Sequence, residues 1–420
     1  MNNQDFTWKI GGEAGFGIMV TGASFAKICA RCNLNIISNT EYPSLIRGGH
    51  NIFTVRAATQ QIFSLNRKID VLVALNKDTM EMDGKELSPD GVMIFDPDDF
   101  KPDDDFPKTT NFLPVPFQQL AKDNNGNILM RNTVALGASL AVLGIDFAVL
   151  ESALKEQFGK KGQETVDINS KTAKAGYDYV LNHLKYQTKV VHQVNKNRNK
   201  IVVTGNEAIG MGAVSSGVKF FSAYPMTPIN GLITYMANHD KKFGFVYKQP
   251  EDEISAINMA IGASFTGARS MTASSGGGFA LMNEAYSMAG MTETPLVVIY
   301  GQRPGPASGL PTWTSQADLR YALSAGHGEF LRFVFAPGDT EEAFWLTKLA
   351  FNLADKYQTP AMILVDKYLC ECLFGQDNAG LLHTDYLPEP AVIYAQKYDR
   401  GNIERAPKED YLRYKITDNG

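Results

Sequence analysis

The chain has 420 residues, of which 44% are hydrophobic, and a formal net charge of −5. This size and composition suffice for two ordinary domain cores, and the mildly acidic balance gives no basis for nucleic-acid binding. No apolar run approaches the roughly 20 residues that cross a bilayer, and the polar residues 1–5 are unlike a signal peptide. We therefore expect a cytoplasmic protein with neither nucleic-acid nor membrane partners.

The first predicted elements are a strand at residues 6–10, a glycine-rich turn at residues 11–17, a helix, and a strand near residues 34–37. This order is typical of a βαβ unit, in which the glycine-rich turn can hold an anion at the helix start. No acidic residue is placed for a ribose after the second strand. Two interpretations stay open, a nicotinamide site and plain close packing of the helix on the strand.

Helices are predicted near residues 134–143, 149–158 and 172–184, and they complete a first domain at residues 1–184. Residues 185–200 are polar and basic, which predicts a linker that either binds an anion or is simply solvated. A second domain is expected at residues 201–375. Its predicted strands lie near Ile201, Phe243, Ala268, Leu296, Phe333 and Ala361. Their alternation with helices favours an α/β fold with a mostly parallel sheet and helices on both faces.

The four cysteines are interpreted as buried thiols. Cys29 and Cys32 form a C-x-x-C pair inside the first helix, but no second pair lies near them in the sequence. Cys370 and Cys372 alternate across the predicted end of a strand. These ligands are too few for a zinc site or an iron–sulfur cluster, so we expect no metal site in this chain and any cluster on a partner chain.

Four polar or glycine-rich segments follow apolar strands of the second domain. They are the turn Tyr-Pro-Met-Thr-Pro at residues 224–228, the acidic helix start Glu-Asp-Glu at 251–253, the run Ser-Ser-Gly-Gly-Gly at 274–278, and the loop Gln-Arg-Pro-Gly-Pro at 302–306. Binding residues gather at such positions in open α/β sheets. Together the four segments predict an active site.

Each segment has a functional and a structural interpretation. The two prolines stiffen the turn, so it either presents the Thr227 hydroxyl to a ligand or is a plain proline turn. Glu253 lies closest to the small, apolar face of its helix, where a carboxylate could share a proton with a ring nitrogen, although acidic residues in a first turn often only complement the helix dipole. Arg303 either clamps a carboxylate or lies on the surface. The glycine run has no accompanying lysine, which argues against a nucleoside-triphosphate loop.

The order and separation of these segments resemble the pyrimidine-binding domain of 2-oxoacid:ferredoxin oxidoreductases. The resemblance extends to residues 260–264 and 303–312 and to Gln316, Asp318 and Leu319. The loop at residues 41–50 is similar to the γ domain of the same family. The chain therefore resembles the α subunit of the 2-oxoglutarate type, in which a γ-type α/β domain is fused ahead of the pyrimidine domain.

This resemblance implies a thiamine-diphosphate-dependent oxidative decarboxylation of 2-oxoglutarate to succinyl-CoA and CO2, with coenzyme A as co-substrate and reduction of ferredoxin. It places Tyr224, Pro225, Thr227 and Glu253 at the pyrimidine end of the cofactor, with Glu253 on the aminopyrimidine N1′. It assigns Arg303 and Thr227 to the 2-oxoacid. Arg320 is a candidate for the second carboxylate of 2-oxoglutarate, with a surface position as the alternative.

The sequence contains no Gly-Asp-Gly followed by a suitably placed Asn. The resemblance therefore implies a β subunit that holds the diphosphate and magnesium, in an (αβ)2 assembly whose iron–sulfur cluster lies on a partner chain. Residues 376–420 are predicted as an extended tail, and the C-terminal domain that follows in the family is expected to be absent, as in a fragment or one piece of a split gene. Pyruvate or a branched-chain 2-oxoacid as substrate, a non-catalytic assembly subunit and an NAD-binding oxidoreductase stay as alternatives.

Overall fold

A computed structural model describes residues 4–45, 48–102, 111–124, 127–183 and 200–377. In these ranges the chain forms two compact units. The first ends at Val202 and also includes the segment that starts at Leu373, and the second spans Val203–Cys372. The predicted linker up to residue 199 and the predicted tail from residue 378 lie outside the described residues.

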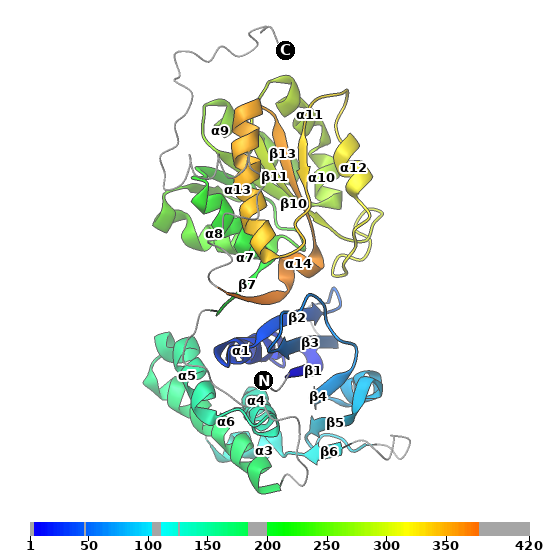
Figure 1. Cartoon of the computed structure of the whole chain (residues 1–420), viewed down its shortest axis with the longest axis vertical. Coiled ribbons are helices and arrows are strands. Elements are labelled where there is room, and N and C mark those ends of the chain that lie inside the picture. Colours follow the sequence, from blue (N-terminus) through cyan, green and yellow to red (C-terminus); the bar gives the residue numbers. More distant parts are fainter. Residues whose placement is uncertain (1–3, 46–47, 103–110, 125–126, 184–199, 378–420) are drawn as a thin grey trace. The chain divides into compact units, whose positions relative to one another are not determined.

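The first unit is built around an 8-stranded sheet with the strand order β6-β5-β4-β1-β3-β2-β14-β7 (Figure 1). Its strands are β1 (Asp5–Ala14), β2 (Asn35–Glu41), β3 (Gly48–Ala58), β4 (Ile69–Ala74), β5 (Leu87–Phe95), β6 (Asn111–Pro114), β7 (Lys200–Thr204) and β14 (Leu373–Asp377). Its helices are α1 (Ile18–Arg31), α2 (Lys77–Asp83), η1 (Gly84–Glu86), α3 (Phe117–Asp123), η2 (Ile128–Met130), α4 (Arg131–Val142), α5 (Phe147–Phe158), η3 (Gly159–Lys161) and α6 (Gln163–His183).

The strands of this sheet run in both directions. Strand β1 pairs antiparallel with β3 and parallel with β4, and β2 pairs antiparallel with β3. Strand β3 lies between β1 and β2, so the two strands of the predicted βαβ unit are not adjacent in the sheet. Residues 48–50, at the end of the loop predicted at residues 41–50, are the start of β3.

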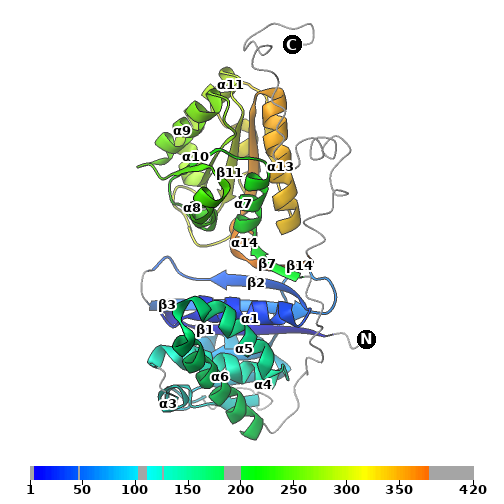
Figure 2. The same cartoon turned by 90° about the vertical axis from the view of Figure 1, so that its left-hand side faces the viewer.

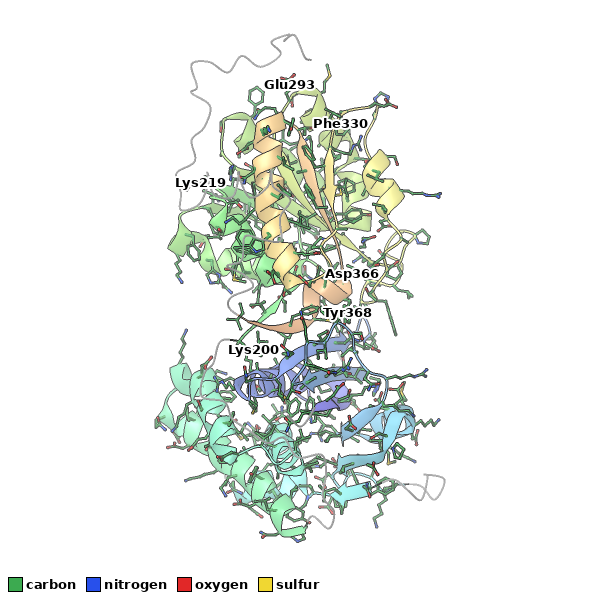
Figure 3. The ribbon with its side chains drawn as sticks, viewed as in Figure 1. Lys200, Lys219, Glu293, Phe330, Asp366 and Tyr368 are labelled. Carbon is green, nitrogen blue, oxygen red and sulfur yellow. The ribbon has the colours of Figure 1, made fainter. Side chains whose placement is uncertain are left out.

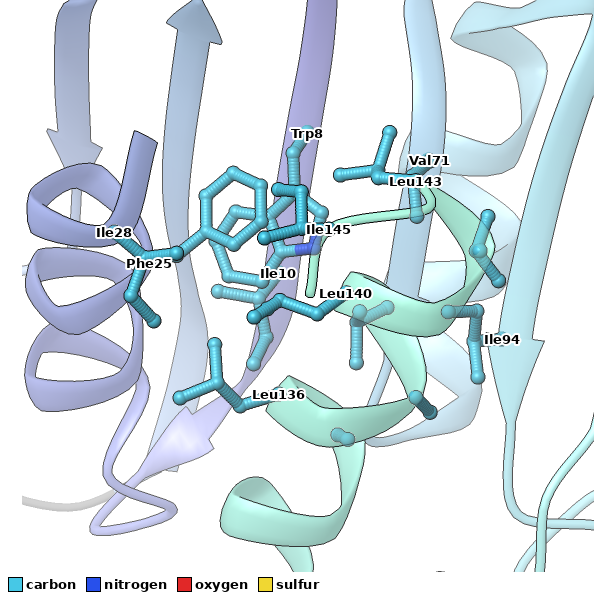
Figure 4. Packing of buried hydrophobic residues seen from close by; sticks show 14 of the residues in the cluster. Trp8, Ile10, Phe25, Ile28, Val71, Ile94, Leu136, Leu140, Leu143 and Ile145 are labelled. Atoms are coloured by element: carbon cyan, nitrogen blue, oxygen red, sulfur yellow. The ribbon is translucent and has the colours of Figure 1, made fainter. Parts of the chain in front are cut away.

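The core of the first unit lies between one face of this sheet and the helices that cover it (Figure 4). Trp8 of β1 stacks on Phe25 of α1 with ring centroids 4.2 Å apart. The indole N–H of Trp8 donates to the Ser139 hydroxyl of α4 at 3.0 Å, so this large side chain is buried without an unpaired donor. Alternate residues of β1 thus face the core, as the period of a strand requires.

The second unit is a 6-stranded sheet with the order β12-β13-β11-β10-β8-β9, in which every recorded pairing is parallel. Its strands are β8 (Phe220–Ala223), β9 (Val246–Lys248), β10 (Ser270–Ser275), β11 (Leu296–Gln302), β12 (Phe333–Phe335) and β13 (Pro360–Asp366). Its helices are α7 (Gly205–Ser215), α8 (Asn230–Phe243), α9 (Glu253–Phe265), α10 (Gly276–Leu281), α11 (Asn283–Met291), α12 (Leu319–Ser324), α13 (Thr340–Tyr357) and α14 (Lys367–Glu371).

Helices cover both faces of the second sheet, with α9 and α10 on one side and α13 on the other (Figure 2). Strands β10, β11 and β13 are consequently buried along their whole length. This agrees with the predicted parallel sheet.

Three local predictions for the second unit differ from the structure. The strand predicted near Ile201 is β7, which lies beside β14 in the first sheet and not in the sheet of the second unit, because a sequence pattern locates a strand but not the sheet that receives it. The strand predicted near Phe243 is β9, which begins at Val246, because α8 runs to Phe243 and Gly244 ends it with a left-handed φ of 68°. Cys370 lies in α14 rather than at the end of a strand. Here the Asp366 carboxylate accepts the Leu369 N–H and so starts a short helix.

Candidate active site

The predicted site residues gather at one edge of the second sheet. Strand β8 leads into the proline turn, β10 into the glycine run, and β11 into Arg303. Because these strands are parallel, their carboxyl ends share one edge, and β13 ends there with Asp366 (labelled in Figure 3). The sheet therefore brings together Arg303 and Thr227, which are 76 positions apart in the sequence.

Glu253 is the first residue of α9 and is only 4% exposed. The helix begins there because the Asp252 carboxylate accepts the Ser255 N–H at 2.7 Å and caps it. Among the described residues, the buried Oε1 of Glu253 has no hydrogen-bond partner. A buried acceptor left unpaired is costly, so this atom is suited to a donor from a ligand.

The glycine run makes room for this carboxylate. A Cβ at Gly278 would lie 2.6 Å from Glu253 Oε1 and 2.0 Å from the Ser274 hydroxyl oxygen. Only glycine permits this approach without displacing the side chains. Ser274 in turn lies beside the proline turn, with its hydroxyl 4.0 Å from the sulfur of Met226. The acidic helix start, the glycine run and the proline turn are thus in contact.

Arg303 connects the end of β11 to the same turn. Its Nη1 donates to the Thr227 carbonyl at 2.9 Å, and the residue is 8% exposed. Its Nε is buried without a partner within the described ranges. Burial lowers the pKa of Arg303, and it outweighs the charge of the nearby Glu253, which raises this pKa. The structure therefore joins Arg303 to Thr227 through the backbone, whereas the predicted role of the Thr227 hydroxyl stays a prediction.

The other predicted positions are more accessible. Tyr224 is 36% exposed, Pro225 is exposed, and Thr227 is half-buried, so this side of the turn can be reached by a ligand. Arg320 is exposed on α12, in agreement with the surface alternative.

A second pair of polar groups lies at the start of α10. A Cβ at Gly276 would be 3.1 Å from the Tyr300 hydroxyl and 3.3 Å from Asp318 Oδ2. Burial, and then the charge of Asp318, raise the pKa of Tyr300 well above its usual value, so this hydroxyl stays protonated. Tyr300 has no sequence signal beyond its place in an apolar strand, and only the fold shows that its hydroxyl reaches the site edge.

Asn206 is a further residue that the sequence did not mark. It is 1% exposed, and its Nδ2 donates to the Pro228 carbonyl of the proline turn at 2.9 Å. An asparagine near a helix start ordinarily indicates a cap. Here the cap is Thr204, whose hydroxyl forms a capping box with Glu207.

The glycine-rich segment at residues 11–17 is a turn only in its second part, because β1 continues to Ala14, and its glycines are closely packed. A Cβ at Gly11 would lie 2.6 Å from Thr79, and one at Gly17 would lie 2.3 Å from the Asn132 amide nitrogen. Asn132 also donates to the Phe16 carbonyl at 3.2 Å. These contacts favour the packing interpretation over a nicotinamide site, because side chains of the unit itself fill the space beside both glycines.

All four cysteine thiols are buried. Burial raises the pKa of Cys29 and of Cys370 well above the usual range of a thiol, so both stay protonated. In the part of the chain that the structure describes, no three His, Cys, Asp or Glu side chains are grouped so that they could hold a metal ion. None of the described helices has the length and hydropathy needed to cross a bilayer.

Both units match known sequence families. Residues 211–373 match the family described as pyruvate flavodoxin/ferredoxin oxidoreductase, thiamine diP-bdg, and residues 7–179 match pyruvate ferredoxin/flavodoxin oxidoreductase. The 2-oxoacid:ferredoxin oxidoreductase subunit alpha of Sulfolobus sp is 33% identical over 99% of this chain and 71% of the relative. The 2-oxoglutarate synthase subunit KorA of Methanothermobacter thermautotrophicus is 42% identical over 39% of this chain and 44% of its own.

A solved structure is similar as well. The 2-oxoglutarate:ferredoxin oxidoreductase from Magnetococcus marinus, with 2-oxoglutarate, coenzyme A and succinyl-CoA bound, matches with a TM-score of 0.83 and 35% identity. The match covers 89% of this chain but 65% of the solved one, so the chain spans just under two thirds of that protein.

The parallel sheet, the buried carboxylate at its edge and the family match define the second unit as a thiamine-diphosphate-binding α/β domain. Since the Sulfolobus relative is 33% identical and is covered over 71% of its length, the chain belongs to the family of 2-oxoacid:ferredoxin oxidoreductase alpha subunits. The predicted family and the predicted α/β fold class are confirmed.

Proposed function

We propose that the chain is the α subunit of an enzyme that oxidatively decarboxylates 2-oxoglutarate to succinyl-CoA and CO2 and reduces ferredoxin. The KorA relatives and the ligands of the Magnetococcus structure support 2-oxoglutarate as substrate. The descriptions of both matched families name pyruvate, so pyruvate or a branched-chain 2-oxoacid stays as the alternative substrate. The rates of turnover of a panel of 2-oxoacids distinguish these substrates.

The observation that carries the proposal is the unpaired, buried carboxylate oxygen of Glu253. This acceptor, in the space that Gly278 leaves, fits the aminopyrimidine of thiamine diphosphate, which brings a donor and an apolar ring. When bound, the cofactor supplies the nucleophile for the keto carbon and an electron sink for loss of carbon dioxide. Glu253 would hold N1′ and its proton, and Tyr224 and Pro225 would line the ring.

The substrate carboxylate is assigned to Arg303 and Thr227 in this proposal. Arg303 keeps an unpaired buried Nε close to Glu253, so a cationic donor and an acidic group lie at the same site edge. A guanidinium can bind a carboxylate through two parallel hydrogen bonds. The 2-oxoacid would thereby be held with its keto carbon near the cofactor.

Other components belong to partner chains in this proposal. A β subunit holds the diphosphate end of the cofactor with magnesium, an iron–sulfur cluster on a partner passes electrons to ferredoxin, and the assembly is (αβ)2. The subunit names of the relatives support a multi-chain enzyme. The first unit acts as the γ-type domain and the second unit, Val203–Cys372, as the pyrimidine domain. We also propose a cytoplasmic location, since four buried cysteines that form no disulfide in the described structure suit a reducing compartment.

The test is Glu253→Gln in the complex with its β subunit, assayed with a panel of 2-oxoacids, coenzyme A and a viologen dye. We expect wild type to prefer 2-oxoglutarate, and the variant to lose about 10²- to 10⁴-fold in kcat, since an amide cannot exchange the proton. Glu251→Gln is the matched control, because Glu251 is exposed and binds only the Ser255 hydroxyl in the described structure. Full activity of the Glu253 variant would refute its role, and preference for pyruvate would refute the substrate.

A further inference from the structure

We propose that Asn206 is a positioning residue that holds the Thr227–Pro228 turn in the geometry that the site requires. This inference rests on the proposed function for its catalytic consequence. Its structural basis is the buried hydrogen bond of 2.9 Å from Asn206 Nδ2 to the Pro228 carbonyl. The bond joins residues 22 positions apart, in the first turn of α7 and in the turn after β8.

The proline turn depends on such external donors. Pro225 and Pro228 lack a backbone N–H, so the turn has few donors of its own and is held through its carbonyl groups. The Thr227 carbonyl accepts from Arg303 and the next carbonyl, that of Pro228, accepts from Asn206. Two adjacent peptide units are therefore fixed by side chains from separate elements, and the position of the Thr227 side chain follows from both.

The neighbourhood is shaped around the Asn206 amide. A Cβ at Gly231 would lie 2.8 Å from Asn206 Nδ2, so glycine there leaves the amide its place. The helix that carries Asn206 is itself fixed at its start, because a Cβ at Gly205 would lie 2.4 Å from the Leu369 carbonyl oxygen and the Thr204 capping box sets its first residue. The donor thus comes from a rigid support.

The choice of asparagine also indicates a positioning role. Its Oδ1 is buried and has no partner among the atoms that the structure describes. An unpaired buried acceptor destabilises the fold, and an apolar residue of the same volume would avoid this cost. The residue therefore contributes through its N–H donor, and the acceptor that receives it is the turn.

Two variants of the full chain in complex with the β subunit test this. Asn206→Leu keeps the volume and removes the donor, and Asn206→Asp keeps the shape and offers only acceptors. The control is Asn352→Leu, at a buried asparagine of α13 whose Oδ1 accepts from Arg269. Arg269 directly precedes the first residue of β10, so this control lies at the opposite end of the strands from the site. Melting curves identify any variant that does not fold, and Asn206→Asp then serves alone.

The first readout is hydrogen–deuterium exchange of the amides at residues 226–233. We expect at least roughly tenfold faster exchange in both Asn206 variants and no change in the Asn352 variant, because local opening becomes easier when the turn loses its anchor. Unchanged exchange would overturn the proposal. This readout needs no catalysis, so it decides the role of Asn206 even if the complex turns over no 2-oxoacid and the proposed function fails.

The second readout is a double-mutant cycle with Thr227→Val on kcat/KM for the preferred 2-oxoacid. Asn206→Leu alone should lower kcat/KM by roughly 10- to 100-fold, the effect of a small misplacement of a binding group. In the Thr227→Val background the same change should cost less than about threefold, since residues that act through one another are not additive. Additive losses would show that Asn206 does not act through Thr227.

Discussion

Gly278 leaves the space that the Glu253 carboxylate occupies, so a side chain at this position should displace the carboxylate. Gly278→Ala would place a Cβ 2.0 Å from the Ser274 hydroxyl oxygen and 2.6 Å from Glu253 Oε1. We expect a loss of about 1–3 kcal/mol in stability from overpacking, together with loss of thiamine-dependent activity as the carboxylate moves. Thermal melting and the dye assay measure the two effects.

The neighbouring glycine is the control for this prediction. A Cβ at Gly277 meets nothing closer than the Ala307 carbonyl oxygen at 3.5 Å, an ordinary contact. Gly277→Ala should therefore be neutral, or stabilise the helix by about 0.5–1 kcal/mol. Equal effects of the two substitutions would show that crowding of Glu253 is not the reason for glycine at position 278.

Some residues of the candidate site can be predicted from the sequence and others cannot. Glu253 is predictable because Asp252 marks a helix start and the apolar spacing after it locates the buried face. Asn206 is not, because its partner lies in a turn 22 residues away and asparagine near a helix start ordinarily indicates a cap. The Thr227 carbonyl that binds Arg303 also escapes prediction, since every residue has a carbonyl and only the fold selects one.

At the scale of elements, α2 and η1 are joined to β1 by a buried cluster of charges. Lys9 of β1 contacts Asp83 at 3.0 Å and Glu86 at 2.9 Å, and His50 of β3 contacts Asp83 at 2.9 Å. Burial alone would raise the pKa of Asp83, but the hydrogen bond from His50 and then the charge of Lys9 outweigh it, so the pKa is lowered. Burial lowers the pKa of Lys9, yet its two acidic neighbours raise it overall.

The sign of the pH dependence follows from these shifts. A carboxylate with a lowered folded-state pKa contributes stability above its unfolded-state value, about 3.9, and loses it as the pH falls through the folded-state pKa. Asp83→Asn should therefore destabilise the chain at pH 7. We expect about 3 kcal/mol, the low end for a broken buried pair, because Glu86 still binds Lys9. The difference in the free energy of unfolding between wild type and the variant should become smaller only below about pH 4.

Urea unfolding of wild type and of the Asp83 variant, at pH 7 and at pH 3, measures this difference in stability. The control is Asp178→Asn on α6, which removes the exposed ion pair with Lys174 and should change the stability by less than about 0.5 kcal/mol. A gap of the same size at both pH values would contradict the ionic origin of the effect.

Elements buried on both sides are the ones that the sequence predicts best. Strands β11 and β13 are continuous apolar runs that no helical period fits, and both lie where they were expected. Strand β9 is three residues long with two exposed positions, so it has too little pattern to locate, and Gly244 alone marks the boundary before it. The mixed direction of the first sheet depends on β3, whose partners are set by long-range pairing rather than by its own residues.

At the scale of the whole chain, the first sheet contains a strand from far along the sequence. Strand β14 pairs antiparallel with β2, with Phe374 opposite Ile37, and the Leu373 N–H donates to the Ser38 hydroxyl at 2.8 Å. Residues 373–375 were predicted to end the second domain, because a sequence pattern shows where a strand lies and not which sheet receives it. The chain thus leaves the first sheet at β7 and returns to it after the second unit.

Gly375 makes this return testable. A Cβ at this position would lie 2.6 Å from Ile36 Cγ1 of β2, so Gly375→Val should push β14 away from β2. We expect faster hydrogen–deuterium exchange both in β14 and at residues 35–41, because β2 would become an open edge whose ladder partners are lost. Gly159→Ala, where no atom lies within 4 Å of the added Cβ, is the control. Protection of residues 35–41 that persists in the Gly375 variant would show that β2 does not need β14, and the first unit would then be complete without the segment that follows the second.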